Sequence, residues 1–222
     1  MMLKQEIFSF CEQTNLNWSD FIESEENHEA LMWLMRWPDW PGFGIILTGA
    51  QGVGKSHLAA LWAQSANAVY VLPHSLNHDP RELFQGESNF VIDNISEFLC
   101  NEEWLFDFYN IVKEKKRYLL LIDRDSPSNW NISLKDLRSR IMSLPRICIR
   151  NYGDEMLVRI CQKIAKDIAI DISDRTLEYI VQTYERDISS LTNILRTLNK
   201  LSLKIQKPIS VPFVKKYLSE LR

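Results

Sequence analysis

The sequence predicts an α/β protein, in which a parallel five-stranded sheet flanked by helices is followed by a small α-helical domain. A glycine-rich phosphate-binding motif at residues 49–56 stands between an apolar segment and an amphipathic one. From residue 44 to about residue 149, short apolar segments alternate with longer amphipathic ones, a pattern typical of βαβ units. After residue 153 only helical patterns follow, so the domain boundary is expected near that point.

Five strands are expected in the first part, each rich in Ile, Leu or Val and bounded by polar or turn residues. They cover residues 44–48, 68–72, 89–93, 118–123 and 146–149. Between the third and fourth strands, Trp104, Phe108 and Val112 fall on one face of a helix over residues 101–116. This helix is the expected crossover connection.

The second part is expected to be a bundle of four amphipathic helices. Apolar residues recur at helical spacing over residues 157–168, 177–184, 188–201 and 214–221. Ser173 is the expected N-cap of the second helix, and Pro212 stands just before the fourth.

Composition is that of a folded globular protein, because 45% of the 222 residues are hydrophobic and 25% are charged. A net charge of -3 gives no overall attraction to nucleic acid, so direct sequence-specific DNA binding is not expected. The four cysteines form no CxxC pair, which favours buried thiols over zinc ligands or disulfides. No apolar segment approaches the length of a membrane span and the start has no signal core, so a cytoplasmic protein is expected.

The motif at residues 49–56 has the GxxxxGK[ST] spacing of a P-loop. Its glycines let backbone N–H groups converge on phosphate oxygens at the N-terminus of the following helix. Lys55 is expected to reach the β and γ phosphates of ATP or ADP, and Ser56 to offer its hydroxyl to Mg²⁺. The expected nucleotide-binding residues are Gly49, Gly52, Val53, Gly54, Lys55, Ser56 and His57. For His57 a structural role on a helix packed against the sheet is the simpler interpretation.

Asp93 ends the third expected strand and is the candidate Walker B carboxylate, which would share the Mg²⁺ with Ser56. Asn94 follows, at the place where many ATPases have a carboxylate that orients the attacking water. Because an amide cannot accept the proton of that water, slow intrinsic hydrolysis is expected.

Two arginines, Arg138 and Arg140, stand two residues apart just before the fifth strand. Paired arginines usually form a solvated helix face. In assemblies of P-loop proteins, however, an arginine from this region stabilises charge on the phosphate of a neighbouring subunit.

With these elements in this order, the chain resembles the DnaA branch of the AAA+ ATPases, and most closely its Hda-like regulatory members. Residues 17–22 (NWSDFI) and residues 36–41 (RWPDWP) carry further resemblance to that family. The resemblance implies that Asp123 or Arg124 lies near the polar sensor-1 position and that Arg140 is an arginine finger acting in trans. It also implies an AAA+ domain over residues 14–151, a helical lid over residues 152–222, and a clamp-binding tail over residues 1–13.

The lid departs from the family pattern at Ser189, where relatives often carry a sensor-2 arginine. Losing that cation should weaken discrimination for the γ phosphate. Together with Asn94, it suggests that the nucleotide acts as a structural or switching ligand more than as a fuel.

In the tail, Gln5 is followed by the apolar anchors Phe8 and Phe10. Short peptides of this form bind bacterial sliding clamps, the β subunit of DNA polymerase III, although an amphipathic turn packed on the domain would have the same composition. The initiator DnaA continues beyond its lid into a helix-turn-helix domain, whereas this sequence stops at Arg222, so origin recognition is not expected.

The resemblance, taken with these observations, implies a regulator of replication initiation that, with the DNA-loaded clamp, stimulates ATP hydrolysis by DnaA through Arg140. Two alternatives stay open: a helicase-loader-like AAA+ ATPase, and a P-loop kinase acting on a small substrate. Homo-oligomer formation is also left open.

Overall fold

The computed structural model describes residues 17–218. The chain divides into two compact units. The first runs to Ala50 and then from Lys55 to Ile149, and the second combines Gln51–Gly54 with the chain from Arg150 onward. The tip of the phosphate-binding turn therefore groups with the second unit.

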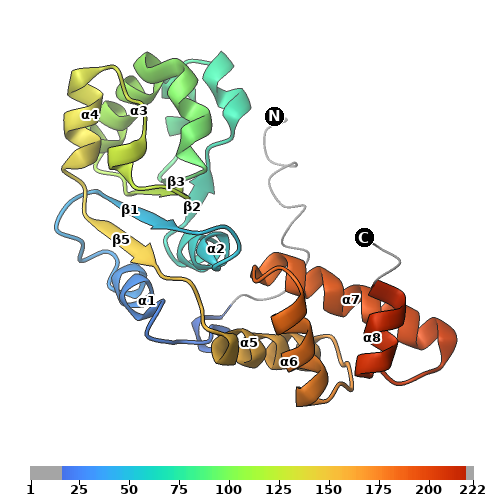
Figure 1. The fold of residues 1–222 in the computed structure, drawn as a ribbon. Helices are drawn as coiled ribbons and strands as arrows, with labels where there is room; N and C mark the ends of the chain where they lie inside the picture. Colours follow the sequence, from blue (N-terminus) through green and yellow to red (C-terminus); the bar gives the residue numbers. More distant parts are fainter. Residues whose placement is uncertain (1–16, 219–222) are drawn as a thin grey trace. The chain divides into compact units, whose positions relative to one another are not determined.

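The first unit is built on a five-stranded sheet with the strand order β2-β3-β4-β1-β5, and all neighbouring strands run parallel (Figure 1). The strands are β1 (Gly44–Gly49), β2 (Ala68–Tyr70), β3 (Asn89–Asp93), β4 (Leu119–Asp123) and β5 (Arg146–Ile149). The prediction of a parallel five-stranded sheet is thus confirmed. The central strands β1 and β4 are buried along their whole length, which explains their continuous apolar sequences.

Helices cover both faces of this sheet, with α3 and α4 on one side and α1 and α2 on the other (Figure 1). Their bounds are α1 (His28–Met35), α2 (Lys55–Ser65), α3 (Glu102–Glu114) and α4 (Lys135–Met142). The expected crossover helix is α3. On this helix, the ring of Phe108 packs edge-on against Phe90 of β3 and stacks on the ring of Trp104. On the opposite face, Leu58 and Trp62 of α2 are fully buried.

The register of the sheet brings three of the predicted site residues to one edge. Thr48 of β1 pairs with Asp123 of β4, and Asp93 of β3 pairs with Ile122 of β4. The carboxyl ends of β1, β3 and β4 therefore meet where Gly49, Asp93 and Asp123 stand. In open parallel sheets this edge is where ligands bind.

The segment before the sheet packs onto α2. The indole Nε1 of Trp18 donates to Ser65 Oγ at 2.9 Å, and the ring of Trp40 stacks on that of Trp62 with centroids 5.2 Å apart. The two segments that carried family resemblance, residues 17–22 and 36–41, thus each contact the helix that follows the P-loop.

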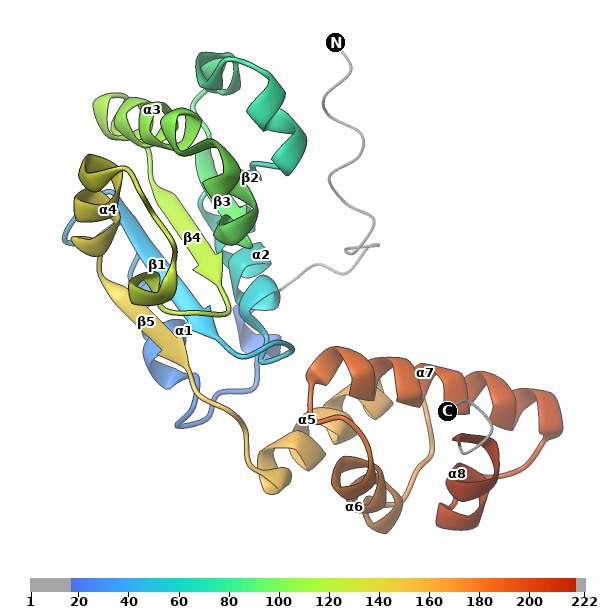
Figure 2. The same ribbon diagram turned by 45° about the horizontal axis from the view of Figure 1, so that its top comes forward.

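The second unit is a bundle of four helices within the described residues, as predicted, and α7 is the longest of them (Figure 2). The helices are α5 (Asp154–Asp167), α6 (Asp174–Thr183), α7 (Ile188–Ile205) and α8 (Val211–Leu218). Leu157, Ile180, Leu195 and Val214, one from each helix, are fully buried. In the part of the chain that the structure describes, no helix combines the length and hydropathy needed to cross a membrane.

Ser173 stands at the predicted N-cap of α6, but its side chain makes no capping bond to the helix backbone. Its hydroxyl instead lies 2.9 Å from the hydroxyl of Thr176. The position was predicted and the interaction was not, because a buried threonine hydroxyl competes for the serine.

Candidate functional site

The phosphate-binding turn connects β1, which ends at Gly49, to α2, which begins at Lys55. Gly52 and Gly54 adopt φ angles of 73° and 90°, which side-chain-bearing residues rarely adopt. The glycine spacing of the sequence motif thus corresponds to a turn that requires glycine at these two positions.

The Lys55 ammonium donates to the carbonyl oxygens of Gly49 and Ala50, each at 2.7 Å. Burial lowers the pKa of Lys55 below its usual 10.5, and the nearby carboxylates of Asp93 and Asp123 partly oppose this shift. The amine is therefore held at the mouth of the turn, where phosphate oxygens could replace the two carbonyls as its partners.

Ser56 and Asp93 are brought together as the sequence predicted for a shared metal ion. The Ser56 hydroxyl donates to Asp93 Oδ2 at 2.7 Å. Neighbouring oxygen ligands of an octahedral Mg²⁺ lie about 3 Å apart, so this pair fits two positions of one shell. Among the described residues no group of three or more His, Cys, Asp or Glu side chains could hold a metal. Mg²⁺ would therefore need phosphate oxygens and water as its other ligands.

Asp123, the expected sensor residue, is buried and fully engaged. Its Oδ2 accepts hydrogen bonds from the backbone N–H and the hydroxyl of Ser96, at 2.9 and 2.6 Å. Its Oδ1 accepts from the backbone N–H groups of Arg124 and Asp125, at 2.7 and 3.2 Å. The carboxylate thus ties the turn after β3 to the end of β4, and its sensor role stays a prediction.

Asn94 follows Asp93 in the left-handed conformation, with φ 63° and ψ 62°. Its side-chain amide donates to the carboxylate of Glu97, three residues along the chain. The departure at Asn94 was evident from the sequence, but Glu97 was not identified as the partner of its amide. The spacing of three residues between Asn94 and Glu97 was the one feature of the sequence that could have indicated this contact.

The start of α7 lies against the tip of the turn, within the second unit. The backbone N–H of Ile188 donates to the Gly52 carbonyl at 3.0 Å, and a Cβ on Gly52 would lie 2.2 Å from the Cβ of Asp187. Asp187 is the N-cap of α7 and accepts from the N–H of Ser190 at 2.8 Å. Ser189, predicted at the sensor-2 position, is exposed in the first turn of the same helix. Asp187 was missed, although an Asp directly before an apolar helical pattern is an N-cap signal.

Val53 and His57 complete the predicted nucleotide residues. The Tyr152 hydroxyl donates to the Val53 carbonyl at 3.0 Å, also within the second unit. The ring of His57 meets Phe21 edge-on with centroids 5.6 Å apart, a packing contact that supports the structural interpretation.

Arg140 lies on α4, half-buried against α3. Its guanidinium donates to the side-chain oxygen of Asn110 and stands 4.7 Å from the centroid of the Phe106 ring. Arg138 is exposed on the same helix. The predicted finger is thus held by two side chains of α3, which the sequence pattern did not identify.

The predicted clamp-binding residues Gln5, Phe8 and Phe10 lie outside the described residues.

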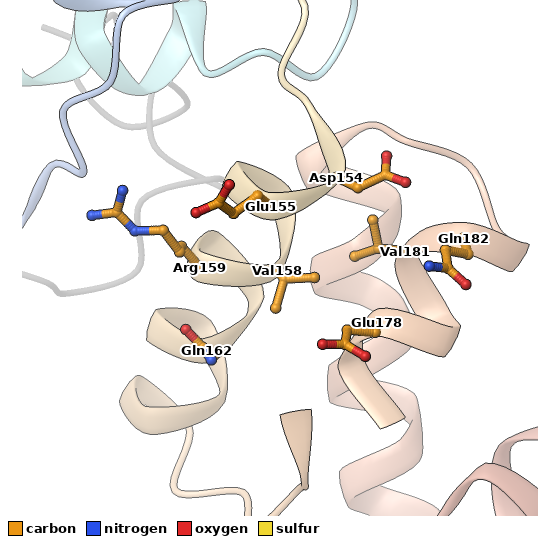
Figure 3. Close-up of a pocket in the computed structure, with 8 residues that line it drawn as sticks. All are labelled: Asp154, Glu155, Val158, Arg159, Gln162, Glu178, Val181 and Gln182. Atoms are coloured by element: carbon orange, nitrogen blue, oxygen red, sulfur yellow. The ribbon is translucent and has the colours of Figure 1, made fainter. Parts of the chain in front are cut away.

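A separate groove of about 360 Å³ opens in the second unit between α5 and α6 (Figure 3). It is lined by Asp154, Glu155, Val158, Arg159, Gln162, Glu178, Val181 and Gln182. Asp154 is already paired with Arg186, and only two of the eight side chains are apolar. Small-molecule sites are mostly apolar, so this groove is a poor ligand pocket.

Comparisons with known proteins bear on the lid, the family and the fold. A family model described as the lid domain of Hda matches residues 154–218. An uncharacterized protein of Haemophilus influenzae is 30% identical over 186 residues, covering 77% of this chain and 79% of the relative.

Solved structures with the same fold include domain III of the replication initiation protein DnaA of Thermotoga maritima. It has a TM-score of 0.79 and 14% identity, and the match covers 93% of this chain and 98% of that one. AMPPCP-bound DnaA from Aquifex aeolicus has a TM-score of 0.73 at 14% identity, covering 95% of this chain and 70% of that one. RuvB of Thermotoga maritima has a TM-score of 0.66 at 17% identity, covering 93% and 72%.

The predicted AAA+ fold and the lid assignment of the helical region are therefore confirmed. The chain belongs to the Hda-like regulators of the DnaA branch of AAA+ proteins.

Proposed function

We propose that this DnaA-related replication regulator binds ADP or ATP and, with the DNA-loaded sliding clamp, stimulates ATP hydrolysis by DnaA. Arg140 is the catalytic arginine finger, and it acts on the nucleotide of the partner. Hydrolysis by DnaA would then end its capacity to start replication.

Nucleotide binding is supported by the arrangement at the carboxyl edge of the sheet. Lys55 would be the phosphate-binding cation, and Ser56 and Asp93, whose oxygens lie 2.7 Å apart, would hold Mg²⁺. The AMPPCP-bound DnaA of Aquifex aeolicus shows that a protein of this fold binds an ATP analogue. Asn94 leaves the site without the usual carboxylate, so intrinsic hydrolysis is slow.

The observation that carries the proposal is the way Arg140 is held. A finger has to present its guanidinium to the partner's phosphate with little loss of side-chain entropy. The Asn110 hydrogen bond and the Phe106 ring restrict this long side chain before any partner arrives. Arginine fingers supplied in trans raise phosphoryl-transfer rates by roughly a thousandfold or more.

Clamp binding is assigned to the tail, with Gln5 in a polar subsite and Phe8 and Phe10 in an apolar one. Recruitment to a clamp on DNA raises the effective concentration at which the regulator meets DnaA. The protein would act in the cytoplasm, and self-association would be a competing use of the same AAA+ interface.

The test is a reconstitution that measures ATP hydrolysis by DnaA in the presence of loaded clamp and this protein. Gln5→Ala should lose stimulation because recruitment fails, and Arg140→Ala should lose it although recruitment persists. Arg138→Ala is the matched control, since it removes the exposed arginine from the same helix. Full stimulation by both the Gln5 and Arg140 variants would disprove the mechanism.

A helicase-loader-like ATPase would share this AAA+ core. It would bind a replicative helicase in a pull-down and would leave the DnaA reaction unchanged. A small-molecule kinase would phosphorylate its substrate in the absence of both the helicase and DnaA.

A further inference from the structure

The charges of the chain are unevenly distributed along its length. Residues 188–218 contain six of the 26 Lys and Arg residues and none of the 29 Asp and Glu residues. The six are Arg196, Lys200, Lys204, Lys207, Lys215 and Lys216. The overall net charge of -3 therefore conceals a wholly basic segment that coincides with α7 and α8.

Three of these cations share one exposed face of α7, the long orange-red helix of Figure 2. Arg196, Lys200 and Lys204 are spaced four residues apart, and side chains at this spacing lie above one another on a helix. All three are exposed, whereas the opposite face of α7 buries Leu195 and Leu198 in the bundle. We call Arg196, Lys200 and Lys204 the basic stripe.

The surroundings of the basic stripe narrow the class of partner. Protein interfaces are enriched in aromatic residues and depleted in lysine, and α7 contains two lysines on this face and no aromatic residue. A membrane-surface helix needs an apolar face directed at lipid, and here that face is buried, leaving only Leu203 exposed at 72%. Single-stranded nucleic acid is held by base stacking on aromatic side chains, which the stripe lacks.

Duplex DNA is the class of partner that fits a row of exposed cations without aromatic residues. It presents closely spaced phosphates, about one negative charge per 1.7 Å of axis, and can be bound by Lys and Arg without any base contact. The stripe extends about 12 Å along the helix, at 1.5 Å per residue, which spans three or four base-pair steps. Such binding carries no sequence preference, in keeping with the expectation that this chain recognises no particular site.

We infer that the basic stripe on α7 is a non-specific binding surface for the phosphate backbone of duplex DNA. The inference goes beyond the activation of DnaA and does not depend on Arg140 or on the clamp. The basic stripe would give a regulator of replication a direct contact with DNA through its lid, in addition to the indirect contact through the DNA-loaded clamp.

The test is fluorescence anisotropy of a labelled duplex of about 30 base pairs, titrated with the full chain in low and moderate salt. Three phosphate contacts predict that affinity falls roughly 40-fold between 50 and 200 mM salt, from a slope of about -0.9 per contact. The triple variant Arg196→Gln/Lys200→Gln/Lys204→Gln should bind at least about tenfold more weakly at 50 mM salt, with a slope reduced by about three. Two duplexes of unrelated sequence should bind equally well.

The matched control is Lys113→Gln/Lys115→Gln/Lys116→Gln, which removes the same charge from exposed positions at the end of α3. It should bind as wild type does. Lys200→Arg/Lys204→Arg keeps the charge and should also bind, which guards against a folding effect of the glutamines. The inference is overturned if the wild-type protein does not bind duplex at 50 mM salt. It is also overturned if the triple variant of the basic stripe binds as well as the triple variant at the end of α3. Stripe-dependent binding to anionic vesicles without binding to duplex overturns it in favour of a lipid surface.

Discussion

A single methyl group at the tip of the P-loop is expected to disrupt the contact with α7. In Gly52→Ala the new Cβ would lie 2.2 Å from Asp187 Cβ, 2.8 Å from Asp187 Oδ1 and 2.9 Å from Asp187 Cα. Contacts under 3.0 Å are essentially never seen for real Cβ atoms, so the backbone of the turn or of the α7 N-cap has to move. The φ angle of 73° adds strain of its own.

The magnitude follows from these two terms. A Cβ in the left-handed region costs about 1–2 kcal/mol, and overpacking a close contact costs about 1–3 kcal/mol. The sum is about 2–5 kcal/mol. If it falls on the nucleotide-binding conformation of the turn, even about 2 kcal/mol corresponds to a roughly 30-fold loss of ADP affinity.

The assay is a double-mutant cycle with Gly52→Ala and Asp187→Gly, measured by chemical denaturation and by binding of a fluorescent ADP analogue. Asp187→Gly removes two of the three overlapping atoms, and glycine is a tolerated N-cap. The double variant should therefore recover at least about 1 kcal/mol relative to additivity. Gly86→Ala is the control, because its Cβ would meet nothing within 4 Å. If Gly52→Ala matches Gly86→Ala in both measurements, the contact has no energetic significance.

Three further predictions concern single side chains. Asn110→Ala should lower the stimulation of DnaA hydrolysis by about tenfold, because Arg140 loses the bond that orients it, while clamp retention in a pull-down stays unchanged. Equal stimulation would contradict the positioning role. Because burial lowers the Lys55 pKa from 10.5, ADP affinity should begin to fall at a lower pH than for an ordinary lysine as pH rises, and calorimetry of Lys55→Met should show no such fall. Burial raises the Cys161 pKa to about 11, so at pH 8 a maleimide should modify exposed Cys100 and spare Cys161 until the protein is unfolded, as mass spectrometry of peptides would show. Equal labelling of both thiols in the folded protein would contradict that burial.

The central strands could be predicted because their sequences carry the signal of burial on both faces. Residues 45–47 of β1 and residues 119–122 of β4 are continuous apolar runs, and both strands are central in the sheet. The lid helices could be predicted equally well, because Leu157, Leu177 and Leu195 belong to apolar patterns of helical spacing and all three are buried. Both signals are local, so a single sequence suffices to find them.

The contacts that complete the site are not local, and the sequence could not supply them. Arg140 was identified by its place before the last strand, but its partners Phe106 and Asn110 lie some thirty residues earlier on another helix. Asp187 meets Gly52 across an even longer separation. Such pairs are set by packing of whole elements, and no periodicity within either segment encodes them.

The turn after β3 gives a physical reason why a P-loop protein of this kind would hold a nucleotide without consuming it. Lys55 and Ser56 would offer a cation and a hydroxyl to phosphate and metal in the proposed nucleotide site. The groups that could orient a water are engaged elsewhere: Asp123 accepts four hydrogen bonds, and Glu97 is held by the Asn94 amide. A water could use either carboxylate only by displacing one of these donors, at a cost of about 1.5–3 kcal/mol for a bond to a charged group. Under the proposed function, the chain would keep its own nucleotide as a ligand, and the hydrolysis that it promotes would take place in DnaA.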